Sequence, residues 1–289
     1  MLSKLIKLPL LKRFIPSLGL RFLKIFKANR GYFKISGIKM FLDFLDPIDR
    51  EIILYQNYED EEVSYLINLI KKYSITNFFD VGSNCGYYSM KVLSEVSNIK
   101  VFAYEPNHEA YYKFNKTIKI NPEYSKRLEL KNYGFSNKNS LLRMQFLKKH
   151  GYNQTGGSSV VENFNYNKEN TFLGKFKIGD ENLHFKNQKL CFKIDVERHE
   201  IKVLEGLKNT FKNNKVILLI EIYEKNFTEV NNLLNQIGSS LDKDELLNLK
   251  PVNKSYRLPS IDEYYDNESK EMVKYFDALI FELHNSFSK

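Results

Sequence analysis

The chain has 289 residues, and 43% of them are hydrophobic, including 22 Phe and 19 Tyr. Apolar content on this scale can build a sizeable core, so the composition excludes an intrinsically disordered protein. The two cysteines, Cys85 and Cys191, lie far apart and match no metal-binding or redox spacing. This argues against a disulfide scaffold and favours a reducing compartment.

The net charge of +9 first suggests a nucleic-acid partner, but the excess lies in one segment. Ten of the 44 Lys and Arg residues fall within residues 1–42, which contain no Asp or Glu. The remaining 34 basic residues nearly balance 35 acidic ones. The charge therefore describes the N-terminal segment, and we do not expect nucleic acid to be the partner.

Residues 1–30 alternate apolar and basic side chains and are interrupted by Pro9 and Pro16. No apolar run approaches the roughly 20 residues of a membrane span, and the alternation does not fit a signal-peptide core. The pattern predicts a basic amphipathic segment that contacts an anionic membrane surface. The alternative is an ordinary basic helix packed on the domain. We expect a cytoplasmic protein. If the basic segment contacts a membrane, the protein lies peripherally at the inner membrane surface.

After this segment, residues 31–74 predict a strand pair (32–44) and a helix (61–73) that leads into a domain spanning 75–289. In that domain strand-like and helix-like stretches alternate. Strands are predicted at 77–81, 100–105, 128–135, 190–196, 216–222 and 275–283, and helices at 87–96, 109–121, 200–213 and 227–238.

The predicted strands are too continuously apolar to be half-exposed. Such strands are typical of a mostly parallel sheet with helices on both faces, so we predict a doubly wound α/β domain. Residues 136–188 break the rhythm, because they are polar and hold only short alternating runs. We predict a hairpin-containing insertion there, over the carboxyl ends of the strands, where loops carry ligand contacts.

A possible ligand site follows the first core strand, which runs into Gly82 and Gly86 just before a helix. This G-x-x-x-G spacing departs from the dinucleotide fingerprint and is weak alone. The next strand ends in Glu105, where a carboxylate can accept hydrogen bonds from ribose hydroxyls. The alternative interpretations are that the glycines form an ordinary tight turn and that Glu105 is an ordinary carboxylate exposed to solvent. Together the two features favour an adenosine-containing ligand.

Four stretches in order, "DVGSNCGYYS", "AYEPN", "KIDVERHEIKVLEGL" and "LLIEIYE", resemble the FkbM-type methyltransferase family. The resemblance covers roughly residues 40–240. It implies a Rossmann-like methyltransferase fold, S-adenosylmethionine as cofactor, and methylation of a hydroxyl. The family typically has glycine where this chain has Arg198, so the backbone there is expected to differ.

By position, the resemblance implies a cofactor loop containing Asp80, Gly82, Ser83, Asn84 and Gly86. Glu105 would bind the ribose, with Asn107 close by. Gly134 and Phe135 would lie near the adenine, although an aromatic residue at a strand end is commonly part of the core.

Methyl transfer to a hydroxyl requires a positioned acceptor and a group that takes its proton. Asp195 ends a predicted strand, and Glu197 would point the same way if the chain stays extended. His199 is a third candidate base because its pKa is intrinsically near neutral. Each of these residues could instead be an ordinary residue at the start of a helix or on the surface.

Three further residues are candidate substrate contacts: Glu221, at the end of a neighbouring strand, and Ser158 and Ser159 in "GGSSV". The serines could equally belong to a flexible lid. The carboxylates leave a divalent cation such as Mg²⁺ open, but nothing in the sequence fixes a ligand geometry, so we assign no metal site.

The leading hypothesis is methylation of a hydroxyl on a sugar, a glycan, or a small or lipid-linked metabolite. One alternative is RNA methylation. Two observations weaken it: the excess of basic residues lies in the N-terminal segment, and the sequence lacks an N-P-P-[YF] motif. Another is a non-catalytic, membrane-peripheral protein with a degenerate nucleotide fold, against which the retained Asp80, Gly82, Gly86 and Glu105 argue.

Overall fold

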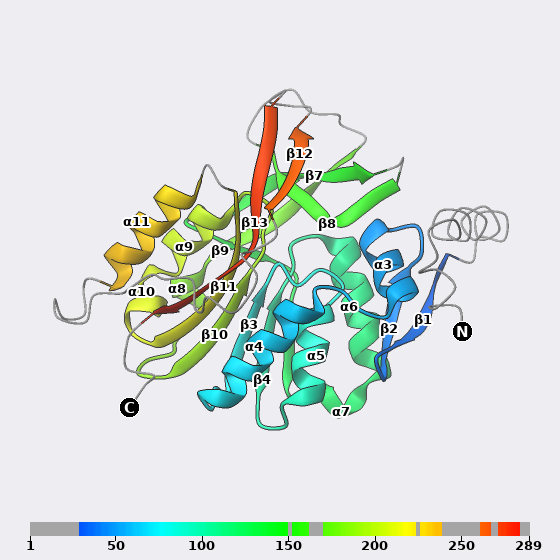
Figure 1. The fold of residues 1–289 in the computed structure, drawn as a ribbon, viewed down its shortest axis with the longest axis horizontal. Helices are drawn as coiled ribbons and strands as arrows, with labels where there is room; N and C mark the ends of the chain where they lie inside the picture. Colours follow the sequence, from blue (N-terminus) through cyan, green and yellow to red (C-terminus); the bar gives the residue numbers. More distant parts are fainter. Residues whose placement is uncertain are drawn as a thin grey trace.

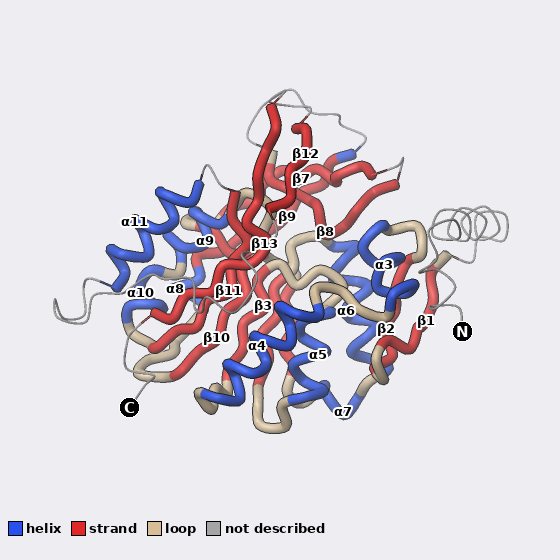
Figure 2. Tube along the Cα trace, in the orientation of Figure 1, coloured by secondary structure: helices blue, strands red, loops and turns tan. Residues whose placement is uncertain are grey.

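The computed structural model of the protein describes residues 29–149, 152–161, 170–223, 226–238, 261–266 and 271–283. A central sheet carries helices on its two faces, and a smaller second sheet lies at one end (Figures 1 and 2). Of the predicted basic segment, residues 1–28 lie outside the described residues. Within the described part of the chain, no helix is long and apolar enough to cross a membrane.

The N-terminal part forms a two-stranded hairpin and two helices. The strands β1 (Arg30–Ile35) and β2 (Ile38–Asp43) pair antiparallel, as the sequence predicts. The helix α4 (Asp60–Lys72) was also predicted, but α3 (Pro47–Tyr55) was missed. Its start signal is local, because Asp46 accepts a hydrogen bond from the backbone N–H of Ile48 and proline occupies the first turn.

The central sheet has seven strands in the order β12-β13-β11-β10-β3-β4-β5. The five from β11 to β5 are parallel, and β13 is antiparallel to both β11 and β12. The prediction of a doubly wound, mostly parallel sheet is confirmed. The strands are β3 (Asn77–Val81), β4 (Lys100–Tyr104), β5 (Leu128–Lys131), β10 (Lys189–Ile194), β11 (Lys215–Tyr223), β12 (Ile261–Asp266) and β13 (Glu271–Leu283).

Two hydrophobic cores lie on opposite faces of this sheet. Consecutive side chains of a strand point to opposite faces, so Phe78 joins one core and Phe79 the other. The first core includes buried residues of α3, α4, α5 and α6, and the second includes residues of α9, α10 and α11. The remaining helix bounds are α5 (Tyr87–Glu95), α6 (His108–Ile120), α7 (Pro122–Ser125), α9 (Glu200–Gly206), α10 (Lys208–Lys212) and α11 (Phe227–Gly238).

Between β3 and β10 the strand order reverses: the chain winds outward from β3 to β4 and β5 on one side, and from β10 to β11 on the other. The connections that leave the two strands therefore diverge. In open α/β sheets such a reversal opens a crevice at the carboxyl ends of the strands, which is where ligands bind. The fold itself places the candidate site after Val81 and Ile194.

The polar insertion forms a second sheet of four strands in the order β6-β9-β7-β8. The predicted strand over 128–135 is wrong as one element, because β5 stays in the central sheet whereas β6 pairs with β9. The elements are β6 (Gly134–Ser136), β7 (Ser140–Lys149), β8 (Tyr152–Val160), β9 (Thr171–Ile178) and the short helix α8 (Gly179–Asn182).

The single helix predicted over 200–213 is also wrong, since it is divided into α9 and α10. The break follows Gly206, which packs directly on the backbone of β6. A side chain there would place its Cβ 2.1 Å from the carbonyl oxygen of Ser136. The chain therefore turns where the insertion sheet meets the main domain.

A buried lysine joins the N-terminal part, α6 and the insertion. Lys113 is 1% exposed, and its Nζ lies 3.0 Å from Asp46 and 2.6 Å from Asp49. The same ammonium donates a hydrogen bond to the hydroxyl of Thr155 on β8, at 3.0 Å. Because the two carboxylates are also buried, one cation offsets the cost of burying both.

We expect Lys113→Met to lower the free energy of unfolding by about 3–5 kcal/mol, because it leaves two buried carboxylates without their counter-charge. Urea denaturation measures this. The matched control is Lys116→Met on the same helix, where the half-buried lysine is expected to contribute less than about 1 kcal/mol. Equal effects of the two substitutions would contradict the role assigned to Lys113.

Candidate active site

The turns that follow β3 and β10 touch each other where the strand order reverses. The backbone N–H of Asp195 donates to the carbonyl of Val81 at 3.1 Å. Gly82 has φ +82°, and a Cβ there would lie 1.8 Å from the carbonyl oxygen of Asp195. Only glycine fits this position, both for its left-handed backbone and for its lack of a side chain. The predicted cofactor loop and the predicted catalytic carboxylate are therefore adjacent.

The loop from Asp80 to Gly86 holds polar groups around the start of α5. Asp80 is fully buried, and its Oδ2 accepts hydrogen bonds from the backbone N–H and the hydroxyl of Ser89, at 3.2 and 2.6 Å. Burial raises the pKa of Asp80. Its Oδ1 and the hydroxyl of Ser83 are buried without a hydrogen-bond partner. Buried polar groups are normally paired, so these two atoms are suited to contact a ligand.

Glu105, at the end of β4, faces the same loop. Its Oε2 accepts a hydrogen bond from the backbone N–H of Asn84 and its Oε1 one from that of Asn107, both at 2.8 Å. The residue is 6% exposed, and burial raises its pKa to about 7. Each carboxylate oxygen has a second lone pair, so both can also accept from ribose hydroxyls. Asn107 additionally caps α6.

The strand β8 of the insertion lies against this loop. The Thr155 hydroxyl donates to Asp46 at 2.6 Å and lies 2.9 Å from the amide oxygen of Asn84. The side chain of Asn107 donates to the hydroxyl of Ser158 at 3.0 Å. Ser158 is thus joined to the predicted cofactor residues, and Ser159 follows it, half-buried, on the same strand.

Asp195 is held between a lysine and a second carboxyl group. Lys193 Nζ lies 2.8 Å from Asp195 Oδ2, and the Asp195 side chain is 28% exposed. Lys193 and a hydrogen bond from Glu221 lower the pKa of Asp195, although burial opposes them. Burial and the charge of Asp195 raise the pKa of Glu221 well above its usual value. The interaction of the two carboxyl groups therefore shifts their pKa values in opposite directions.

The chain does not stay extended after Asp195, so that premise for Glu197 was wrong. Glu197 has φ +50° and Arg198 φ +76°, and both lie in the left-handed region. Arg198 occupies the position where the family typically has glycine, the residue that adopts this conformation without cost. Burial, Asp195 and Glu200 raise the pKa of Glu197 to about 8.

Glu200 opens α9 and accepts a hydrogen bond from the backbone N–H of Arg198 at 3.0 Å. It is 2% exposed, and burial raises its pKa to about 7. Its Oε2 is buried without a partner. This carboxyl group thus stabilises the left-handed turn, in keeping with its position at the start of the helix.

Two functional candidates were missed by the sequence analysis. Lys193 was detectable, since it is the one charged residue within an otherwise apolar stretch of β10. Glu59 gave no local signal. It precedes α4, its Oε2 accepts a hydrogen bond from the hydroxyl of Tyr88 at 2.7 Å, and it interacts electrostatically with Lys193 and Asp195. A carboxylate from the N-terminal part therefore joins those of β10 and β11.

The other predicted residues lie in the junction between the two sheets. His199 Nε2 is 3.0 Å from the hydroxyl of Ser136, and its ring packs on Phe176. Burial lowers the pKa of His199 to about 4, so its ring is neutral at pH 7. Phe135 is fully buried and packs on Tyr104, with ring centroids 4.3 Å apart. Gly134 leaves no room for a side chain beside Phe176.

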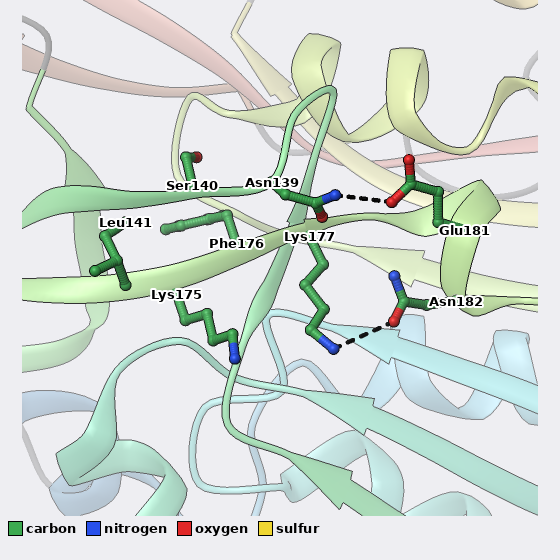
Figure 3. A pocket seen from close by; sticks show the side chains of 8 residues that line it. All are labelled: Asn139, Ser140, Leu141, Lys175, Phe176, Lys177, Glu181 and Asn182. Atoms are coloured by element: carbon green, nitrogen blue, oxygen red, sulfur yellow. Dashed lines mark hydrogen bonds between the residues drawn. The ribbon is translucent and has the colours of Figure 1, made fainter.

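Two cavities have walls formed by other residues. One of about 450 Å³ is formed by β7, β9, α8 and the residue before β7, and Figure 3 shows Lys175 and Lys177 on its wall. The other, of about 400 Å³, lies between α9 and α11. Neither is lined by a predicted site residue. No group of three or more His, Cys, Asp or Glu among the described residues could hold a metal ion.

Comparison with known proteins identifies one family. Residues 80–244, more than half of the chain, match the family model described as the methyltransferase FkbM domain. The curated proteins contain no significant match.

Solved structures give distant similarities. An FkbM methyltransferase from Methylobacillus flagellatus KT is 14% identical, with 72% of this chain and 43% of that chain covered and a TM-score of 0.42. A putative RNA methyltransferase from Pyrococcus horikoshii is 12% identical and has a TM-score of 0.40. The similarity covers 78% of this chain and 85% of that chain. TYW2 of M. jannaschii, in complex with AdoMet, is 10% identical and has a TM-score of 0.39. The similarity covers 88% of this chain and 87% of that chain. This chain thus spans less than half the length of the FkbM structure.

The left-handed backbone of Arg198 gives a test of the turn. Arg198→Gly and Arg198→Ala both remove the guanidinium and its stem, but only glycine also lacks the Cβ and so relieves the backbone cost of roughly 1–2 kcal/mol. After allowing for the greater unfolded-state entropy of glycine, we expect the glycine variant to be more stable than the alanine variant by about 1 kcal/mol. Thermal and urea unfolding measure the difference. Equal stability of the two variants would show that the turn is not left-handed in solution.

Proposed function

Since the chain belongs to the FkbM methyltransferase family and is an S-adenosylmethionine-dependent methyltransferase, we propose that it methylates a hydroxyl group on a sugar, a glycan or a lipid-linked metabolite. The observation that carries this proposal is the group of half-exposed carboxyl groups beside the Gly82 turn. These groups meet the need of a hydroxyl acceptor for a partner that takes its proton.

The β3–α5 loop fits the cofactor. The unpartnered Ser83 hydroxyl and Asp80 Oδ1 are a donor and an acceptor suited to its amino-acid part. Glu105, with Asn107 behind it, has acceptor capacity left for the ribose. Gly82, Asn84 and Gly86 form the turn around these groups, and Gly134 and Phe135 border the adenine side. When bound, S-adenosylmethionine supplies an electrophilic methyl group on a positively charged sulfur.

The proton of the acceptor is taken by a carboxylate at the end of β10. Asp195 is ionised and is fixed by Lys193 and by the hydrogen bond from Glu221. Glu197 has a pKa of about 8, which suits proton exchange near neutral pH. We assign the base to one of these two residues, and substrate contacts to Glu221, Ser158 and Ser159. His199 is a weaker candidate, because a ring with a pKa of about 4 binds protons poorly at pH 7.

The character of the site also bears on the class of acceptor. Carboxyl groups can form hydrogen bonds with several hydroxyls of one polyol. This supports a carbohydrate-type hydroxyl as the acceptor. The basic apolar sequence of residues 1–30 supports an acceptor at the inner surface of a membrane, which would make the enzyme a cytoplasmic, peripheral one.

We expect Glu105→Ala to weaken binding of S-adenosylmethionine and S-adenosylhomocysteine by about 1.5–3 kcal/mol, because charge-assisted hydrogen bonds to the ribose are lost. Isothermal titration calorimetry measures this, with NAD as the ligand that is not expected to bind. The control is Glu123→Ala, on an exposed residue of α7. Wild-type affinity in Glu105→Ala would remove Glu105 from the cofactor site.

The function itself is tested with S-adenosylmethionine that carries tritium in its methyl group, incubated with a fractionated extract of the source cells. We expect label in carbohydrate or lipid fractions. Asp195→Asn and Glu197→Gln should keep cofactor affinity, and at least one should lose turnover by about 10²-fold or more. Label in RNA would overturn the proposed acceptor, and full turnover in both variants would overturn the assigned base.

A further inference from the structure

A surface of aromatic and basic side chains lies on the outer side of the β1–β2 hairpin and α6. We call it the aromatic–lysine face and define it by Tyr32, Phe41, Tyr112, Lys34, Lys39 and Lys116. Tyr32 is 53% exposed and Tyr112 is 43% exposed. Figure 1 shows the hairpin at the edge of the molecule, beside α6 and far from α9 and α11.

The aromatic rings form one continuous row. Tyr32 and Phe41 are cross-strand partners with ring centroids 5.1 Å apart, and Phe41 meets Tyr112 edge-on at 6.1 Å. The backbone N–H of Phe41 donates to the hydroxyl of Thr117 at 2.9 Å, which fixes the hairpin to α6. Tyrosine combines an apolar ring with a polar hydroxyl, so two half-exposed tyrosines in a row suit a boundary between water and an apolar phase.

The charges on the face have one sign. Lys34 and Lys39 lie directly opposite each other on the hairpin, an arrangement in which like charges repel and weaken the strand pair. Lys116 lies over the Tyr112 ring, with its Nζ 5.4 Å from the centroid. The neighbouring acid Glu109 is paired with Arg30 at 3.1 Å. An unfavourable lysine pair at an exposed turn points to an anionic partner outside the chain.

We propose that the aromatic–lysine face docks on the headgroups of an anionic lipid bilayer, with its tyrosine rings at the interface and its lysines against lipid phosphates. Interfacial tyrosines and juxtamembrane lysines are the side chains that such a surface selects. In the sequence, β1 is preceded by residues 1–28, which contain seven basic and no acidic residues. The proposal does not depend on the identity of the methyl acceptor.

The chain contains no tryptophan, so a single introduced one reports its own surroundings. Tyr32→Trp and Tyr112→Trp place the reporter on the face, and Leu173→Trp places it on an exposed position of β9, where Leu173 is 57% exposed. The full-length variants are mixed with vesicles of phosphatidylglycerol and phosphatidylcholine that contain brominated lipid. We expect quenching and a blue shift for the first two reporters and no change for the third.

Flotation of the full chain then tests the charge. We expect the triple variant Lys34→Glu, Lys39→Glu and Lys116→Glu to lower partition into anionic vesicles by about tenfold or more at roughly 0.15 M salt. Lys175→Glu, on β9, is the control that should leave it unchanged.

Three results would overturn the proposal. The first is that the wild-type protein does not float with anionic vesicles. The second is that the protein floats while the tryptophans of the Tyr32→Trp and Tyr112→Trp variants stay unquenched, since residues 1–28 would then carry all of the binding. The third is that sedimentation shows the face buried between two copies of the chain.

Discussion

One ammonium group on β10 supplies the counter-charge for the carboxylates around the ends of β3 and β10. The Lys193 side chain is 8% exposed, contacts Asp195 at 2.8 Å and lies 4.8 Å from the centroid of the Tyr88 ring. The charges of Asp195, Asp80 and Glu59 raise the pKa of Lys193 against the effect of burial. Burial raises the pKa of a carboxyl group, and Lys193, together with a hydrogen bond from Glu221, offsets this effect at Asp195.

A second buried lysine acts on the other side of the cofactor loop. Lys113 forms ion pairs with Asp46 and Asp49, and Asp46 accepts a hydrogen bond from Thr155, whose hydroxyl also lies beside Asn84. The loop thus lies between two groups of fixed charges, each centred on one lysine. Side chains held in this way need little rearrangement when a ligand arrives, which is the condition for electrostatic stabilisation of a reaction.

The sequence predicted what depends on short-range pattern. Continuous apolar strands and amphipathic helices indicated the doubly wound sheet, and the order of its strands brings Gly82 and Asp195 together. The left-handed turn at Glu197 and Arg198 could not be predicted, because neither residue type favours φ above zero. Glu59 was equally hidden, because its place depends on contacts with residues far along the chain, such as Tyr88. Charge balance inside a core is a property of the assembled structure.

The residues around the crevice do not all belong to the stretch that defines the family. The match begins at Asp80, yet Glu59 and Asp46 precede it, and β12 and β13 follow its end at residue 244. A chain trimmed to residues 80–244 would keep the predicted cofactor loop but lose Glu59, the Asp46 partner of Thr155 and one edge of the sheet. In this protein the stretch that matches the family model and the set of residues around the candidate site have different borders. Two relatives that share this stretch can therefore differ in the walls around their acceptors.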